Sequence, residues 1–350
     1  MNENPINISR LYEKGDPSDH CYLLSGGTVF LHFADLPAEA VEMKKALIGT
    51  VEFFASEPAQ LVRPRMFGVS VEASSSLSKV SFETLSDTVQ DFAFGVAANR
   101  FLAEIIDRTN ALLTQQAKDL QFQRQRFDKL ARNMAGVITQ LEILAKKKDL
   151  AAVKNLCARF NQSPTVQIGK SLLYDNIVTR LELAPEEHEK NVCVYEANGA
   201  LCKKGDDASS MFVLLRGKIR VASHGKTIAR IETPGEAFGE LSLFMNNKRT
   251  AELTALEKST VLVITKENLR EFHEDHPLMF FQIARTLAKR VGMNLERIEQ
   301  GILDRRDPER FAERAEEAAR ERITLVRDLR EIERLTKERG LADLLFLLSE

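Results

Sequence analysis

The residues best suited to chemistry lie in the segment 234–252, which reads PGEAFGELSLFMNNKRTAE. A Gly-Glu pair opens a short helical turn, and backbone amides from Gly239 to Ser242 are expected to be unpaired within that turn, where they favour a phosphate. Arg249 offers a charged fork for phosphate oxygens. Glu240 accepts hydrogen bonds when ionised, and a ribose 2′-hydroxyl beside the phosphate would be a suitable donor. The segment therefore predicts a cradle for an anionic, phosphate-bearing ligand.

This segment resembles the phosphate-binding cassette of the cyclic nucleotide-binding domain family, which includes the catabolite activator protein, the regulatory subunits of protein kinase A and nucleotide-gated channels. The resemblance runs over about residues 185–297 and includes Gly205, Gly217, Gly235, Gly239, Glu240, Arg249, Thr250 and Ala251. It implies a β-roll flanked by helices, with Glu240 on the ribose and Arg249 on the cyclic phosphate. The ligand-binding residues it implies are Gly239, Glu240, Leu241, Ser242, Arg249, Thr250 and Ala251.

The ligand itself is less narrowly defined by these residues. A Glu and an Arg nine positions apart could instead form an ion pair across the turn, which would stabilise little at the surface. A bound ligand is favoured because a partly enclosed Arg249 without an anion would be costly. Thr250 could reach a guanine amino group, but family members with Thr here include ones that prefer adenine. Cyclic AMP is therefore favoured over cyclic GMP, and cyclic dinucleotides stay open.

The elements that must position the cassette occur twice in the chain. Residues 11–33 and 201–221 have the same order of features. Each begins with Lys-Gly-Asp, which Pro17 follows in the first segment, and continues with a polar turn, an apolar strand, a Gly-centred turn and another strand. Two matching units about 190 residues apart suggest an internal duplication. Further short strands with close turn signals follow each unit, as in a jelly-roll-like β-roll. In the first copy, the helix after the strands is expected to begin near Thr88.

The first copy has a cassette-shaped segment at 47–60, LIGTVEFFASEPAQ, with different chemistry. Thr50 stands where the resemblance implies the ribose glutamate, and Ala59-Gln60 replace the Arg-Thr pair. Arg63 and Arg65 lie just downstream and are interpreted as out of register. This copy is expected to have lost ordinary cyclic-nucleotide binding and to serve assembly or an unknown ligand.

Helical periodicity dominates the rest of the chain. Leu113, Leu120, Phe127, Met134 and Leu141 recur every seven residues, with Ala117, Ala131, Ile138 and Ala145 between them and Arg124 interrupting the seam. Such a heptad favours a homodimer helix over a helix that lies against its own domain. The tail repeats the pattern with Phe311, Ala315, Ala318, Leu325, Leu329 and Ile332, and is expected to be an exposed amphipathic helix.

These elements predict an α+β fold with two β-rolls and flanking helices, joined by a long helical segment and followed by a helical tail. The expected domains are a degenerate roll at 1–107, a helical linker or dimerisation region at 108–184, a cyclic nucleotide-binding domain at 185–299 and an amphipathic tail at 300–350.

Composition narrows the classes of function. The chain has 350 residues, with 49 Lys plus Arg against 51 Asp plus Glu, so no net field draws it to nucleic acid or an anionic membrane. Without an apolar run of membrane-spanning length or a leader pattern, it is expected to be cytoplasmic. The four cysteines form no CxxC pair, and His273 and His276 are interpreted as the solvated end of a helix instead of a metal site. No nucleophile elbow, HExxH or P-loop is present, so no enzyme is expected.

The predicted function is a cyclic-nucleotide receptor. Its ligand would reposition the helix at 277–299, and the tail from Arg305 would contact an unidentified protein partner. The alternatives are a ligand-free scaffold, a subunit of an enzyme on another chain and a transcription regulator. The last is disfavoured because the tail has balanced charge and no turn before Gly340 that would form a helix pair for DNA. No DNA and no membrane partner are expected.

Overall fold

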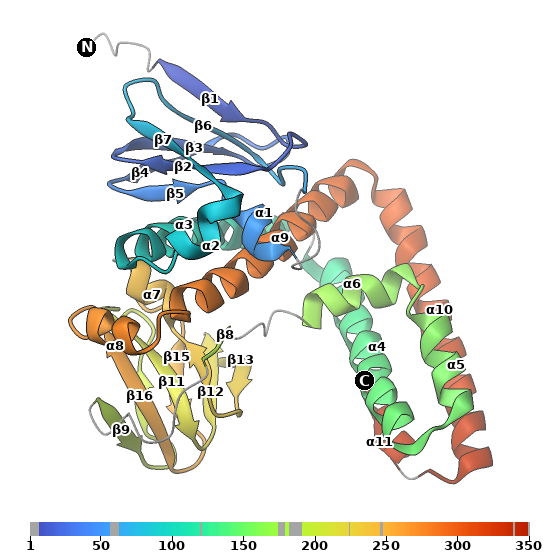
Figure 1. Ribbon diagram of the computed structural model, residues 1–350. Helices are drawn as coiled ribbons and strands as arrows, with labels where there is room; N and C mark the ends of the chain where they lie inside the picture. Colours follow the sequence, from blue (N-terminus) through green and yellow to red (C-terminus); the bar gives the residue numbers. More distant parts are fainter. Residues whose placement is uncertain are drawn as a thin grey trace. The chain divides into compact units, whose positions relative to one another are not determined.

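The structure, a computed structural model, describes residues 7–56, 63–119, 121–173, 179–181, 191–223, 225–245, 248–338 and 340–348 (Figure 1). The chain forms two compact units. The first consists of Met1–Asn110 and Ile177–Leu295, and the second of Ala111–Asn176 and Glu296–Glu350. Each unit is thus built from two segments that are far apart in the sequence.

The first unit contains a β-roll made from the first hundred residues. One antiparallel sheet has the order β1 (Ile8–Tyr12), β6 (Gly68–Glu72), β3 (Gly27–His32), β4 (Glu39–Met43), and the other has the order β5 (Ala46–Ile48), β2 (His20–Leu24), β7 (Leu77–Ser81). Alternation with period two decides which side chains of β3 enter the core: Val29 and Leu31 are buried, and their neighbours are only half-buried.

A second roll in the same unit repeats this strand order and adds one strand at each edge of its second sheet. One sheet runs β10 (Ala200–Cys202), β15 (Glu252–Ala255), β12 (Ile219–Ser223), β13 (Lys226–Ile231). The other runs β8 (Thr179–Arg180), β14 (Glu236–Phe238), β11 (Ser210–Arg216), β16 (Ser259–Thr265), β9 (Val192–Tyr195). The side chains of Phe212, Leu214 and Phe238 fill the space between the sheets. The expected α+β class with two β-rolls and flanking helices is confirmed.

Short helices accompany the strands of both rolls. These are α1 (Val51–Ala55), α2 (Phe82–Thr88), α7 (Glu240–Phe244) and α8 (Leu269–Asp275). The expectation that the helix of the first roll begins near Thr88 is wrong, since α2 begins at Phe82. Ser81 explains the earlier start because its hydroxyl accepts a hydrogen bond of 3.2 Å from the Glu83 amide and so caps the helix.

Two long helices, α3 (Phe92–Asp119) and α9 (Met279–Arg306), follow the rolls and meet within the first unit. The Asn99 side chain donates hydrogen bonds to the carbonyl oxygens of Gly95, at 2.9 Å, and Phe280, at 3.0 Å. The Phe280 ring lies directly against Gly95, where a Cβ atom would clash with it. Close approach of these helices therefore depends on a residue without a side chain.

His273 lies near the end of α8, but its side chain is not solvated as expected, although the neighbouring Glu274 and Asp275 are exposed. Its side chain is buried, and its Nε2 atom lies 2.9 Å from the carbonyl oxygen of Gln90. The ring also packs against Phe280 at a centroid distance of 4.8 Å. His273 is thus a packed histidine inside the first unit.

The second unit is helical. It contains α4 (Gln121–Lys148), α5 (Ala151–Phe160), α6 (Pro164–Leu173), α10 (Pro308–Thr336) and α11 (Gly340–Leu347), together with the end of α3 and the end of α9. The heptad positions Phe127, Ala131, Met134, Ile138, Leu141 and Ala145 are buried in its cores, whereas Leu120 lies outside the described residues. Helices of the same chain thus cover the face through which a homodimer was expected. The structure therefore agrees with the alternative, in which the heptad helix lies against its own domain.

The tail helix shares these cores. Phe311, Ala318, Leu325, Leu329 and Ile332 are buried against the linker helices. The expectation of an exposed tail is therefore wrong for this face, because its apolar residues are needed to close the helical unit. Asn133 and Arg159 reinforce the packing with contacts to Leu347 and Asp328 of the tail.

No described helix is both long and apolar enough to cross a bilayer. No group of three or more His, Cys, Asp or Glu side chains with metal-binding geometry occurs among the residues that the structure describes.

Candidate functional site

The cassette of the second roll is held by a glycine with left-handed backbone geometry. Gly239 has φ of +77° at the start of α7, and a Cβ atom there would lie only 2.8 Å from Nη1 of Arg249. Any other residue would therefore be strained and would displace the guanidinium. Gly239 thus allows Arg249 to lie directly beneath the turn.

Main-chain hydrogen bonds fix the backbone of Arg249. Its carbonyl oxygen accepts from the Gly205 amide at 2.9 Å, and its amide donates to the Asp206 carbonyl oxygen at 2.8 Å. The Asp206 carboxylate in turn accepts from the Lys203 amide at 2.7 Å, which secures the turn. The Lys-Gly-Asp turn therefore positions the arginine that lies more than forty residues later.

Arg249 is 94% buried, and its side chain is only partly hydrogen-bonded. Its Nη2 atom donates to the Ser210 hydroxyl at 2.9 Å, and the guanidinium carbon lies 5.1 Å from the centre of the Phe212 ring. Among the described residues, neither Nε nor Nη1 has a hydrogen-bond partner. Burial lowers the pKa of Arg249, and nearby Cys202 and Asp206 oppose that shift. A buried guanidinium with two such donors is suited to receive an anion.

Glu240 does not form the ion pair with Arg249 that the alternative interpretation supposed. Its carboxylate is buried and pairs with Arg290 of α9. Glu240 is therefore connected to the helix that follows the roll, and Arg249 is bonded to Ser210 instead.

The other predicted residues are arranged around this pair. Leu241, Ser242 and Ala251 are half-buried, and Thr250 is exposed. The Ser242 amide donates to the Gly239 carbonyl oxygen at 3.2 Å, so the expectation that it is unpaired within the turn is wrong. Residues 246–247 of the cassette lie outside the described residues.

The first roll contains the same frame around Arg65. The Arg65 carbonyl oxygen accepts from the Gly15 amide at 2.9 Å, and the Arg65 amide donates to the Asp16 carbonyl oxygen at 2.8 Å. Gly49 has φ of +85°, and a Cβ atom on it would lie 2.8 Å from Arg65 Nη1. Arg65 thus has the position in the first roll that Arg249 has in the second.

This placement corrects the interpretation of Arg65 as out of register. Sixteen positions separate Gly49 from Arg65, whereas ten separate Gly239 from Arg249, so counting along the chain misplaces the arginine. The extra length lies between α1 and Arg65, and Ala59-Gln60 fall in a part of it outside the described residues.

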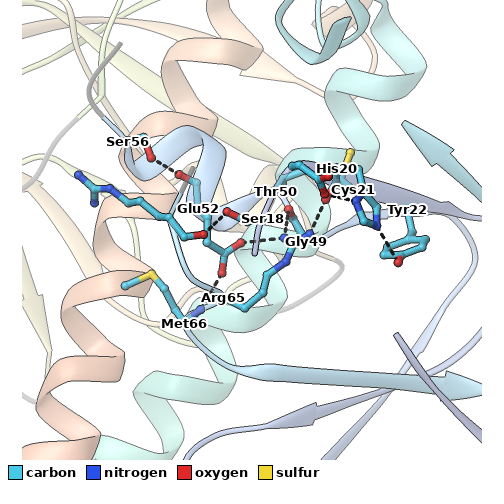
Figure 2. A network of polar contacts seen from close by, with 12 residues as sticks. Ser18, His20, Cys21, Tyr22, Gly49, Thr50, Glu52, Ser56, Arg65 and Met66 are labelled. Atoms are coloured by element: carbon cyan, nitrogen blue, oxygen red, sulfur yellow. Dashed lines mark hydrogen bonds and ion pairs between the residues drawn. The ribbon is translucent and has the colours of Figure 1, made fainter. Parts of the chain in front are cut away.

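Sequence reasoning missed Glu52, the main partner of Arg65. Figure 2 shows the Glu52 carboxylate facing the guanidinium, with Oε2 at 3.1 Å from Nη1. Its Oε1 accepts from the Met66 amide at 2.9 Å, and Arg65 also donates to the carbonyl oxygens of Gly49, at 2.7 Å, and His20. The signal was available in the aligned turns: Glu52 in GTVEFF stands where Ser242 stands in GELSLF.

Comparison with known proteins supports the interpretation of the second roll. Residues 192–276 match the family described as the cyclic nucleotide-binding domain. A cyclic nucleotide-gated cation channel of Ictalurus punctatus is 28% identical over 131 residues, which are 35% of this chain and 19% of the channel. The cyclic nucleotide-gated channel alpha-2 of Bos taurus is 30% identical over 118 residues, which are 32% of this chain and 17% of the channel.

Among solved structures, the N-terminal domain of a transcriptional regulator from Streptomyces coelicolor A3(2) shares 26% identity with this chain. The match covers 28% of this chain and 74% of that chain, with a TM-score of 0.25. The chain spans less than a fifth of the length of the two channels. Together with the Gly239, Glu240 and Arg249 geometry, the family match establishes that residues 192–276 are a cyclic nucleotide-binding domain.

Proposed function

We propose that this chain is a cytoplasmic, non-enzymatic receptor that binds one cyclic nucleotide in the second roll, with cyclic AMP favoured over cyclic GMP. The observation that carries the proposal is the buried Arg249 side chain, whose Nε and Nη1 atoms have no partner among the described residues. A cyclic phosphate would supply one negative charge and several acceptor oxygens to these donors.

The proposed pose places the ligand between two groups of opposite charge. The phosphate would contact Arg249, and the ribose 2′-hydroxyl would donate to Glu240. Gly239, Leu241, Ser242 and Ala251 would line the phosphate side. The exposed Thr250 would lie at the edge of the pocket, where adenine is favoured by the resemblance to family members with Thr at this position.

The proposed output runs through α9. Glu240 pairs with Arg290, so a ribose that binds Glu240 changes the environment of a side chain on this helix. Since α9 continues from the first unit into the second, a shift of the helix would reach the helical tail. A ligand drives such a change only by the difference in its affinity for the two helix arrangements.

The partner of the receptor is proposed to be a protein that contacts the helical unit. The expected division into domains at 1–107, 108–184, 185–299 and 300–350 remains part of the proposal. A homodimer would need a surface other than the heptad face of α4, because α5, α6, α10 and α11 share the cores in which that face is buried.

Calorimetric titration of nucleotide-free protein tests the proposed function. Cyclic AMP is expected to bind with micromolar or tighter affinity at one site per chain, and cyclic GMP more weakly. 5′-AMP, which carries a second phosphate charge and an open ribose phosphate, is the matched negative ligand. Absence of binding by cyclic AMP, cyclic GMP and cyclic dinucleotides would contradict the receptor and leave a ligand-free scaffold.

The contact between Glu240 and Arg290 leads to a separate prediction. Arg290→Met removes a partner that neutralises the Glu240 carboxylate, so the ribose hydroxyl gains a stronger acceptor. The affinity for cyclic AMP is expected to rise by up to about fivefold, because a partly exposed ion pair is worth at most about 1 kcal/mol. Calorimetry on Arg290→Met and on the control Arg285→Met, a half-buried arginine of the same helix, measures the change. Equal affinity in Arg290→Met would show that the ion pair does not oppose ligand binding, and weaker affinity would show that Arg290 supports the ligand; either result contradicts the prediction.

A further inference from the structure

We infer that the Glu52 carboxylate is a built-in ligand of the first roll. It occupies the anion position at Arg65 that the proposed function gives to a cyclic phosphate at Arg249. The inference rests on that proposed function only for the identity of the anion in the second roll.

The frames of the two rolls define the position. Gly49 and Gly239 have similar positive φ angles, +85° and +77°, and Arg65 and Arg249 make the same pair of main-chain bonds. Counting from the two glycines, Glu52 then corresponds to Ser242. A carboxylate therefore enters the first cassette where the second has a short hydroxyl side chain.

One nitrogen atom distinguishes the two sites. Nη1 of Arg65 donates to the Gly49 carbonyl oxygen at 2.7 Å and to Glu52 Oε2 at 3.1 Å. Nη1 of Arg249, which lies equally close to its glycine, has no partner among the described residues. The donor that is satisfied by Glu52 in the first roll is thus the donor offered to a ligand in the second.

Burial and charge support the same conclusion. The side chains of Glu52 and Arg65 are each 1% exposed, and both carboxylate oxygens accept a hydrogen bond. A carboxylate and a cyclic phosphate diester each carry one negative charge, so either neutralises one guanidinium. Tyr12 encloses the pair, with its ring centre 4.3 Å from the guanidinium carbon, and burial followed by the charge of Glu52 raises the Tyr12 pKa. Among the described residues, Nε of Arg65 has no hydrogen-bond partner, as Nε of Arg249 has none, but the charge and both Nη atoms of Arg65 are satisfied without a nucleotide.

The internal ligand also gives the first roll a structural role, which is to hold residues that pack against α9. Phe54 of α1, two residues after Glu52, packs against Phe281 of α9 at a centroid distance of 5.5 Å. Met66, whose amide is bonded to Glu52, lies against Gly292 of α9. By holding α1 and Met66 in place, the carboxylate provides a fixed surface for the helix that carries Arg290.

The test uses the full chain with Arg249→Ala, which removes the second site from the measurement. In this background Glu52→Ser copies the second-roll cassette, and Glu52→Gln keeps the shape of the side chain but removes its charge. Both are expected to lower the melting temperature of the roll by about 5 °C or more, because a buried guanidinium loses its anion. Glu42→Gln, an exposed glutamate of the same roll, is the matched control and is expected to change nothing.

Millimolar inorganic phosphate, compared with sodium chloride at equal ionic strength, then provides the decisive measurement. It should raise the melting temperature of the Glu52 variants more than that of the parent, and the extra rise should disappear when Arg65→Met is added. If Glu52→Ser does not fold, Glu52→Gln gives the same readout. Unchanged melting temperatures, or equal responses to phosphate in parent and variants, would overturn the inference. Neither result depends on whether Arg249 binds a nucleotide, so the two proposals fail separately.

Discussion

Arg249→Ala is expected to weaken cyclic AMP binding by at least about 100-fold. The variant loses two charge-assisted hydrogen bonds to the phosphate, each worth about 1.5–3 kcal/mol. Because a 100-fold loss of affinity corresponds to about 2.7 kcal/mol, the loss of both bonds is sufficient to produce it. Arg249→Lys keeps the charge but loses the planar fork, so a loss of about tenfold is expected. Calorimetric dissociation constants for the two variants and the wild type give the comparison.

Arg216→Ala serves as the control for this prediction because Arg216 is an exposed arginine of the same roll. Its affinity should equal that of the wild type. Binding by Arg249→Ala within threefold of the wild type would contradict the assignment of Arg249 to the phosphate, even if the chain binds a cyclic nucleotide elsewhere.

The corresponding substitutions in the two rolls are expected to have opposite effects on stability. Arg65→Met leaves the Glu52 carboxylate buried without its partner and should lower the free energy of unfolding by about 3–5 kcal/mol. Arg249→Met removes a guanidinium whose Nε and Nη1 atoms already lack partners, so it should be neutral or stabilising in nucleotide-free protein. Urea unfolding followed by circular dichroism, with the transition of the first unit compared among variants, measures both changes.

Two further variants sharpen the comparison. Glu52→Leu combined with Arg65→Met removes both charges and should recover most of the stability lost in Arg65→Met. Cyclic AMP at a hundred times its dissociation constant should stabilise the wild type by about 2.7 kcal/mol and leave Arg249→Met unchanged. Equal destabilisation by Arg65→Met and Arg249→Met would show that the two arginines have equivalent surroundings in the free protein.

Local patterns determined much of the second roll. Strand alternation and turn glycines predict the rolls, and Gly239, Glu240 and Arg249 could be assigned because they lie within one short segment with family spacing. The heptad and the tail pattern were equally clear about which faces are apolar. They could not say which helix covers each face, and the structure shows that linker and tail cover one another.

The sequence by itself determined the two repeated rolls and the cassette of the second, because these depend on backbone preferences and on residues close together in the chain. Only the tertiary structure decided that Arg65 matches Arg249, since the match rests on bonds to Gly15 and Asp16 across a loop of different length. It alone joined Glu240 to Arg290, fifty residues away, and Glu52 to Arg65. A charge pattern records which groups exist, whereas burial and partner geometry decide whether a buried arginine is already neutralised or still able to receive an anion.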